Sequence, residues 1–482
     1  MVYSLSPINT KDYDGTLAIL YGNEVSDRNL PLAKREMEYL KRRREEDPEA
    51  IVRFDRLPGH LFIVNFDAEK PAPICQEHLR RSAAKLVTML ADLKADSIAV
   101  TAEGSLPEEM VAFLEGLFLA DYRFDRYKAK PAHHIATVTV DQAFLSQQEL
   151  DTNQRLWNRL FWCREWVNTP VADLNAAEFA EQLETIARDM DHVECTVFNK
   201  KQIESLRMGG LLAVNRGSVD EPRFVVLEYK PAVAINAKPI ALVGKGIMYD
   251  TGGLNIKPDD YMQEMKSDMA GAATMASVLF TAADNQLPIH LVALLPMTDN
   301  RPGFNAYAAD DILTMYDGTT VEVVNTDAEG RLILADAIAY AVDKYDPELL
   351  IDAATLTGAA VRAISTFGIA AMQQNAANPL GLLKVVGEQV YERIVEFPFW
   401  DEYDELIKSD MADVKNCGTA QAGTITAGKF LARFAKQTPY IHLDIAGVAY
   451  FTKPQHYYAV GASGYGIRLL YAFLQTYDLM KK

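Results

Sequence analysis

From residue 193 onward the chain alternates short apolar runs with segments of helical spacing, and this alternation constrains the fold more than any other feature. The runs are apolar throughout instead of alternating with polar residues, which is typical of strands buried on both faces. We therefore expect an α/β fold with a mixed, mostly parallel sheet covered by helices. The expected strands are 195–198, 224–229, 240–243, 290–296, 349–353 and 441–445.

We expect two domains, because 482 residues are more than one domain usually contains. Residues 1–150 are predicted to form a smaller α/β domain that makes oligomer contacts or shields a site in its neighbour. Residues 151–482 are predicted to form the larger domain, and a connector helix at 147–167 leads into it. In the first domain the expected strands are 17–21, 61–65, 97–101 and 135–140, and the expected helices are 32–46, 75–93 and 107–120.

Two local patterns predict particular structures in the second domain. Asn175 precedes a helical segment, and its side chain suits the N-cap position of a helix at 176–190. Asp317 and Gly318 stand between two apolar runs, which predicts a hairpin with a two-residue turn.

Charge and composition exclude several classes of protein. A net charge of −18 repels polyphosphates, so nucleic acid is an unlikely partner. The four cysteines have no CxxC spacing, which fits reduced thiols in the cytoplasm and argues against a zinc–thiolate site. We also find no signal peptide and no apolar run long enough to span a membrane, so a cytoplasmic protein is expected.

The stretch NTDAEGRL at 325–332 lies between a strand-like run and a helical one. It places Asp327, Glu329 and Arg331 at a strand-to-helix corner, where open α/β sheets usually carry their sites. Alone the signal is weak, because an acidic pair before a helix more often complements the helix dipole.

A second glycine-rich stretch at 243–273 strengthens that signal, because it adds Asp250, Asp268, Lys245 and Lys257. Four carboxylates in one cleft cannot all stay ionised unaided, since like charges raise one another's pKa. Two divalent cations would balance the charge, and such a pair, about 3.5–4 Å apart, activates water. No HExxH or HxH occurs, so carboxylate oxygens would have to hold the metal. Lys245 could join them only if a cation lowered its pKa.

The two stretches together resemble the signatures of the leucyl aminopeptidase (cytosol aminopeptidase) family of two-metal exopeptidases. Further matches lie at 352–358, 409–416, 423–427 and 442–447, and the resemblance covers residues 160–482. It implies a metal-dependent aminopeptidase that releases the first residue of peptides with a free N-terminus. It also implies a homohexamer.

The resemblance assigns roles to individual residues. Lys257 would be the electrophilic catalytic cation, and Arg331 would hold a bicarbonate that serves as base. Backbone groups of Thr355, Leu356 and Gly358 would surround that anion. The two ions would be Zn or Mn, with Co or Mg possible. The implied metal ligands are Lys245, Asp250, Asp268, Asp327 and Glu329.

Substrate preference rests on the pocket for the first side chain, implied to be lined by Met265, Thr355, Ala446 and Ala449. Relatives often carry methionine where this chain has Ala449, so we expect a wider apolar pocket. Large apolar residues such as Leu should be preferred, because burying an unpaired charge is costly.

Two further expectations concern loops near the motifs. Residues 308–311 depart from the Arg-Pro-Gly-Asp usual in the family, which should alter loop rigidity and leave the chemistry intact. We expect Asp410, Asp413 and Lys415 to form a structural network that supports the site.

Two other interpretations of the sequence stay open. Another two-metal hydrolase, such as a phosphoesterase, would also use carboxylates, though typically together with histidines that these motifs lack. A non-catalytic or DNA-architectural relative of the same fold is the second. The complete catalytic set argues against it, and so does the acidic charge.

Overall fold

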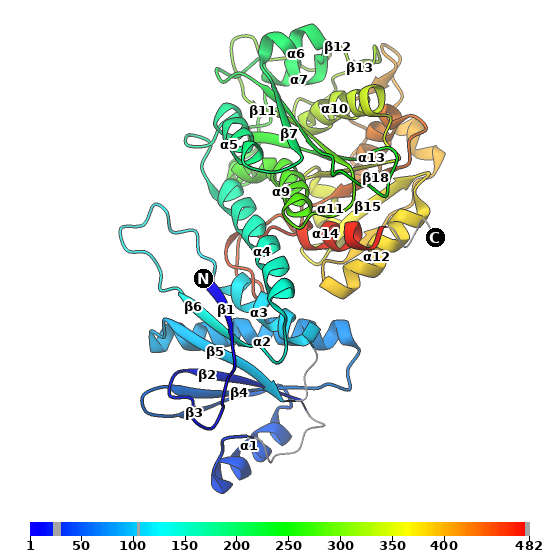
Figure 1. Ribbon diagram of the computed structural model, residues 1–482. Helices are drawn as coiled ribbons and strands as arrows, with labels where there is room; N and C mark the ends of the chain where they lie inside the picture. Colours follow the sequence, from blue (N-terminus) through cyan, green and yellow to red (C-terminus); the bar gives the residue numbers. More distant parts are fainter. Residues whose placement is uncertain (23–29, 104–106, 478–482) are drawn as a thin grey trace. The chain divides into compact units, whose positions relative to one another are not determined.

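The computed structural model describes residues 1–22, 30–103 and 107–477, and the chain folds into two compact units (Figure 1). The first unit comprises Met1–Asn158 together with Phe451–Val460, and the second comprises Arg159–Tyr450 together with Gly461–Lys482. The division falls inside helix α4 (Gln147–Asn168), the predicted connector. No sequence pattern indicated that residues 451–460 belong with the N-terminal unit.

The first unit is a six-stranded sheet in the order β1-β6-β5-β2-β4-β3, parallel except where β3 meets β4. Figure 1 shows α2 and α3 on one face of it and α1 on the other. Strands β1 and β3 are additional to those predicted. The elements are β1 (Val2–Ser6), β2 (Leu17–Gly22), α1 (Lys34–Glu46), β3 (Ile51–Asp55), β4 (His60–Phe66), α2 (Ala72–Leu93), β5 (Ser97–Glu103), α3 (Pro107–Asp121) and β6 (Thr137–Asp141).

The second unit is built on a nine-stranded sheet in the order β16-β15-β18-β14-β9-β11-β8-β7, with β10 also paired to β11. The run β18-β14-β9-β11 is parallel, and the antiparallel pairings lie toward the edges, which confirms the mixed, mostly parallel sheet. Its strands are β7 (Val193–Phe198), β8 (Arg223–Tyr229), β9 (Ile240–Gly244), β10 (Gly246–Asp250), β11 (Leu291–Asn300), β14 (Leu349–Ala354), β15 (Ile369–Gln374), β16 (Ile394–Glu396) and β18 (Tyr440–Asp444).

Helices cover both faces of this sheet, so that β9, β11 and β14 are buried along their whole length. Helices α9 and α14 pack against one another on one face, while α7, α10 and α13 share a core with the other face. The helices are α5 (Ala176–Arg188), α6 (Lys200–Leu206), α7 (Gly209–Asn215), α8 (Asp259–Met262), α9 (Ala270–Asp284), α10 (Glu329–Tyr345), α11 (Gly358–Ile364), α12 (Ala377–Val390), α13 (Gly423–Ala435) and α14 (Ile467–Thr476).

The two local predictions had different outcomes. Asn175 does cap α5, because its side chain accepts hydrogen bonds from the backbone N–H groups of Ala177 and Glu178. The hairpin between β12 (Ile312–Thr314) and β13 (Thr320–Glu322) exists, but the prediction of a two-residue turn was wrong. Met315 N–H bonds to Thr319 O, which leaves three residues, 316–318, in the loop.

The arrangement of strands brings distant parts of the chain to one edge of the sheet. The carboxyl ends of β9, β10, β11, β14 and β18 meet there, since Ala353 pairs with Gly244, Asp250 with Asn300 and Ala354 with Asp444. Most of the motifs singled out in the sequence lie at the end of one of these strands or begin a helix beside it. The stretch 409–416 instead leads into β17 (Val414–Lys415), which belongs to a separate three-stranded sheet. Among the described residues, no helix is both long and apolar enough to cross a bilayer.

Candidate active site

Four carboxylates converge at the carboxyl edge of the large sheet. Asp250 ends β10, Asp268 lies on the 3-10 helix η2 (Met265–Met269), Asp327 lies in the turn before α10, and Glu329 begins α10. Carboxylate oxygens of Asp250, Asp327 and Glu329 lie within 4.8 Å of one another. The structure therefore brings together the acids that the two sequence stretches supplied.

Two lysines tie these acids together. Lys245 Nζ lies 2.7 Å from Asp268 Oδ1 and 3.0 Å from Glu329 Oε1. Lys257 Nζ lies 2.7 Å from Asp250 Oδ2 and 2.6 Å from Asp327 Oδ1. Fully ionised, the four carboxylates and two ammonium groups would sum to −4 + 2 = −2, a charge that favours the binding of cations.

The pKa values reflect this crowding. Burial raises the pKa of Asp268 well above its usual range, and Lys245 offsets that only in part. Burial and then Asp250 raise the pKa of Asp327 to about 6. Glu329 differs: burial alone would raise its pKa, but Lys245 and Lys257 together lower it. The cluster is therefore costly to ionise fully without added positive charge.

Lys245 is an ammonium group in this arrangement. Burial by itself lowers its pKa, but Asp268, Glu329 and Asp250 outweigh burial and raise it. An amine that ligates a metal must lose this proton, so only a cation placed among the same carboxylates can reverse the balance.

Unpaired lone pairs in the cluster fit a divalent cation. Asp268 Oδ2 and Glu329 Oε2 are buried and, within the described part of the chain, have no hydrogen-bond partner. A buried acceptor without a partner is costly. Oxygens of carboxylates are also the ligands that Mg and Mn prefer, and Zn accepts them too.

Glycine makes the close packing of Lys245 possible. An added Cβ on Gly330, the second residue of α10, would lie 2.2 Å from Lys245 Cε. Gly252 and Gly253 have φ of +86° and +65°, which fold the chain after Asp250 back toward the cluster.

Asn300 and Thr326 join the two sequence motifs, and sequence reasoning missed both. Asn300 Nδ2 donates to Asp250 Oδ1 at 2.8 Å and to Thr326 O at 3.0 Å. Thr326 Oγ1 donates to Gly252 O at 2.6 Å, and the Tyr307 hydroxyl donates to Thr326 O at 2.7 Å. The only available signal was that Asn300 is a polar residue at the end of a long apolar strand.

Arg331 is 6% exposed, and its side chain is held by a backbone carbonyl. Its Nη1 donates to Asn416 O at 2.8 Å, and its Nε has no partner among the described residues. The buried Asn416 side chain in turn accepts from Val324 N–H and donates to Asn325 O. Asn416, also missed from sequence, thus fixes both Arg331 and the turn that carries Asp327.

Of the three residues expected to form a structural network, Asp413 anchors the loop at 409–416 through its side chain. The Asp413 carboxylate accepts two hydrogen bonds from Thr320, one from its backbone N–H and one from its side-chain hydroxyl, each at 2.8 Å. Lys415 lies on β17 (Val414–Lys415), which pairs with β13, and Asp410 is exposed. In the loop at 308–311, Asp310 has φ of +71°, a conformation in which the glycine usual in the family meets no steric cost.

The remaining predicted residues lie on the loops beside the cluster. Thr355 O accepts from Lys245 Nζ at 2.9 Å, and Thr355 Oγ1 donates to Asp268 at 2.7 Å. Leu356 N–H donates to Asp444 Oδ1 at 3.2 Å, so this N–H is already used. The others are Gly358 at the start of α11, Met265 at the start of η2, and Ala446 and Ala449 after β18.

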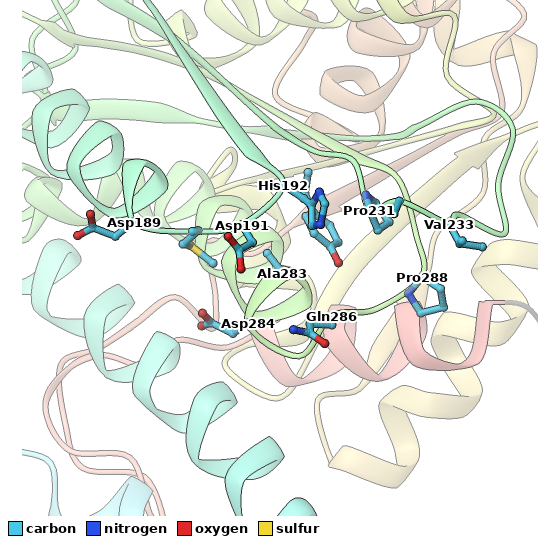
Figure 2. A pocket seen from close by; sticks show the side chains of 12 residues that line it. Asp189, Asp191, His192, Pro231, Val233, Ala283, Asp284, Gln286 and Pro288 are labelled. Carbon is cyan, nitrogen blue, oxygen red and sulfur yellow. The ribbon is translucent and has the colours of Figure 1, made fainter.

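A cavity of about 560 Å³ lies elsewhere (Figure 2). Its lining includes Asp191, His192 and Asp284, from the segments before β7 and at the end of α9. It therefore lies at the amino ends of the central strands, the opposite edge from the carboxylate cluster. Asp284 is paired with Arg159 at 2.6 Å.

Comparisons with known proteins identify the family of this chain. The family model "Cytosol aminopeptidase family, catalytic domain" matches residues 161–471. A probable cytosol aminopeptidase of Geobacter sulfurreducens is 39% identical over 432 residues, 87% of this chain and 86% of the relative. One of Chlorobaculum tepidum is 43% identical over 389 residues, 77% of this chain and 76% of the relative.

Two solved structures have the same fold. The bottromycin maturation enzyme BotP in complex with Mn has a TM-score of 0.85 and 28% identity, and covers 97% of this chain and 100% of its own. A mutant of tomato leucine aminopeptidase has a TM-score of 0.86 at 24% identity, covering 98% and 96%.

The packing of Gly330 against Lys245 gives a direct test of the site. In Gly330→Ala the added Cβ would collide with Lys245 Cε, so Lys245 must move. We expect Mn affinity to fall by about 10–100-fold, measured by isothermal titration calorimetry. Gly381→Ala on α12 is the matched control, because its Cβ would meet nothing within 4 Å. Unchanged Mn binding by Gly330→Ala would show that Lys245 contributes nothing to the metal site.

Proposed function

We propose, from the premise that this chain belongs to the cytosol aminopeptidase family of metal-dependent peptide hydrolases, that it releases large apolar N-terminal residues at a two-metal centre. The observation that carries this proposal is the convergence of Asp250, Asp327 and Glu329 within 4.8 Å, with Lys245 and Lys257 between the acids. Asp268 completes the set through Lys245.

The donor set supports two divalent ions. Lys245, Asp268 and Glu329 form one group of contacts, and Lys257, Asp250 and Asp327 form the other. We assign the ligands to Lys245, Asp250, Asp268, Asp327 and Glu329. When bound, the ions supply a nucleophilic water and Lewis acids for the substrate's amine and carbonyl. Mn or Zn are the preferred candidates, Co or Mg are possible, and the similar BotP structure is a complex with Mn.

Lys257 is proposed as the group that acts on the substrate. It is the less buried of the two lysines, with 14% of its side chain exposed against 3% for Lys245. Its carboxylate neighbours, Asp250 first, overcome burial and raise its pKa, so it stays an ammonium group. A fixed ammonium can donate to the carbonyl oxygen of the scissile bond, where negative charge develops.

Arg331 is proposed to hold an anion, bicarbonate, which would supply a base for the proton of the nucleophilic water. The described cluster contains no histidine to serve as base. A buried guanidinium with an unpartnered Nε suits a planar oxyanion, which can accept two parallel hydrogen bonds. Thr355 lies on the adjoining loop and Gly358 begins α11, and both can contribute backbone groups.

The substrates are proposed to be peptides with a free N-terminus, in the cytoplasm, acted on by a homohexamer. Met265, Thr355, Ala446 and Ala449 would line the pocket for the first side chain. Ala449 is buried, and it would leave room for a large apolar group where a longer side chain would fill the space.

Hydrolysis of leucine p-nitroanilide tests the proposal. We expect activity that a chelator abolishes and that added Mn or Zn restores. Lys257→Ala should lower kcat by about 100-fold or more with metal stoichiometry unchanged, because it removes a transition-state contact. Hydrolysis of a phosphate ester but not of the leucine amide, or activity that persists after chelation, would contradict it.

The pocket proposal has its own test. Ala449→Met should lower kcat/KM for Phe and Leu amides relative to Ala amide, by about 10-fold, because one or two methylenes account for such discrimination. The parent chain should prefer Leu, Met and Phe over Asp and Gly. A parent preference for Asp, or a Met variant with an unchanged ranking, would remove Ala449 from the pocket.

A further inference from the structure

Asp444 is a buried carboxylate outside the proposed set of metal ligands. It ends β18 and is 1% exposed. Its Oδ1 accepts from the N–H groups of Leu356 and Ala446, each at 3.2 Å, and its Oδ2 accepts from the Thr357 hydroxyl at 2.7 Å. A buried carboxylate with three donors is held in a single orientation.

One of these donors belongs to a peptide unit that also contacts the metal-site lysine. The C=O of Thr355 and the N–H of Leu356 lie on the same planar peptide. Lys245 Nζ donates to that C=O at 2.9 Å, while Asp444 accepts from that N–H. The peptide is therefore fixed at both ends, and rotating it would break both bonds.

Asp444 also fixes the residues on the C-terminal side of this peptide. The Thr357 hydroxyl that it binds accepts from Ala360 N–H, which caps α11, and lies 2.7 Å from the Thr424 hydroxyl on α13. The bond to Ala446 N–H fixes the turn after β18. One carboxylate thus orients the loop beside Arg331 and the turn that carries Ala446.

A neighbouring basic side chain partly offsets the effect of burial on the pKa of Asp444. Burial raises its pKa, and His442 is the largest opposing influence. His442 is itself bonded to Asp352 at 2.8 Å, and both side chains are fully buried. Arg331 also lies within electrostatic reach of Asp444. Two acidic side chains, Asp352 and Asp444, therefore have two basic side chains, His442 and Arg331, as neighbours.

We propose that Asp444 is a positioning residue that selects the orientation of the Thr355–Leu356 peptide, so that its carbonyl faces Lys245 and its N–H faces away. A reversed peptide would present an N–H to Lys245 Nζ, which is itself a donor, and the hydrogen bond from Lys245 to Thr355 O would be lost. Asp444 acts through hydrogen bonds from the peptide and not through its charge. The proposal rests on the two-metal function, with Lys245 as a ligand.

Two substitutions separate geometry from charge. In Asp444→Asn the amide oxygen can accept from Leu356 and Ala446, and the amide NH₂ can donate to Thr357, whose hydroxyl can then donate to Thr424. Asp444→Glu keeps the charge but moves the carboxylate by one methylene. Asp336→Glu is the matched control, because Asp336 is a fully buried acid that also accepts backbone N–H bonds, from Leu211 and Tyr316.

The experiment is a Mn titration of each full-length variant, alongside kcat on leucine p-nitroanilide and the melting temperature. For Asp444→Glu we expect one of two Mn sites to weaken by about 10–100-fold, the range for residues that orient ligands, with the other site unchanged. Its kcat should fall by a similar factor. Asp444→Asn should stay within about 3-fold of the parent, well below that range, in both Mn sites and in kcat. Asp336→Glu should lower only the melting temperature.

Each outcome decides the proposal. Equal Mn affinity in Asp444→Glu and the parent would overturn it, and so would an Asp444→Asn variant as impaired as Asp444→Glu, since charge would then be what matters. An equal loss of Mn affinity in Asp336→Glu would also overturn it, because the effect would then reflect general destabilisation of the fold. The Mn titration can be carried out without turnover of a substrate. A parent chain that binds two Mn ions but does not hydrolyse the leucine amide would therefore contradict the proposed function without contradicting this inference.

Discussion

The pairing of two lysines with three buried carboxylates and one partly exposed carboxylate is the constraint on which the rest of the second unit depends. Lys245 bridges Asp268 and Glu329, and Lys257 bridges Asp250 and Asp327. Burying this many charges is costly, and removing one partner of such a pair leaves the other charge without a counter-ion. The glycines and amides around the cluster hold the six groups at contact distance.

The sheet explains how residues so far apart in sequence reach one point. Parallel strands end at a common edge, so the segments after β9, β10, β11, β14 and β18 meet there without long connections. The excess of carboxylates over lysines and the unpaired carboxylate oxygens then make this edge, and not the cavity at the opposite edge, the place where cations are expected. Function therefore follows from strand direction as much as from residue type.

Much of the fold and of the candidate site could be predicted from the sequence, because apolar runs indicate buried strands and the acidic motifs indicate where cations can bind. The central strands, the Asn175 cap and the members of the cluster were all predicted. Asn300, Asn416 and Asp444 were not, since each acts through hydrogen bonds with segments that are distant in sequence. The hairpin loop was predicted too short, because Tyr316 N–H is drawn to the buried Asp336. The association of residues 451–460 with the first unit carried no pattern at all.

We infer that the four carboxylates and the Lys245 amine together hold two divalent cations. Anomalous diffraction from crystals soaked in Mn tests it most directly. We expect two Mn peaks per chain, about 3.5–4 Å apart, between Asp250, Glu329 and Asp268 with Lys245 Nζ as a ligand. A single peak, or peaks elsewhere with both lysines still bound to the carboxylates, would contradict it.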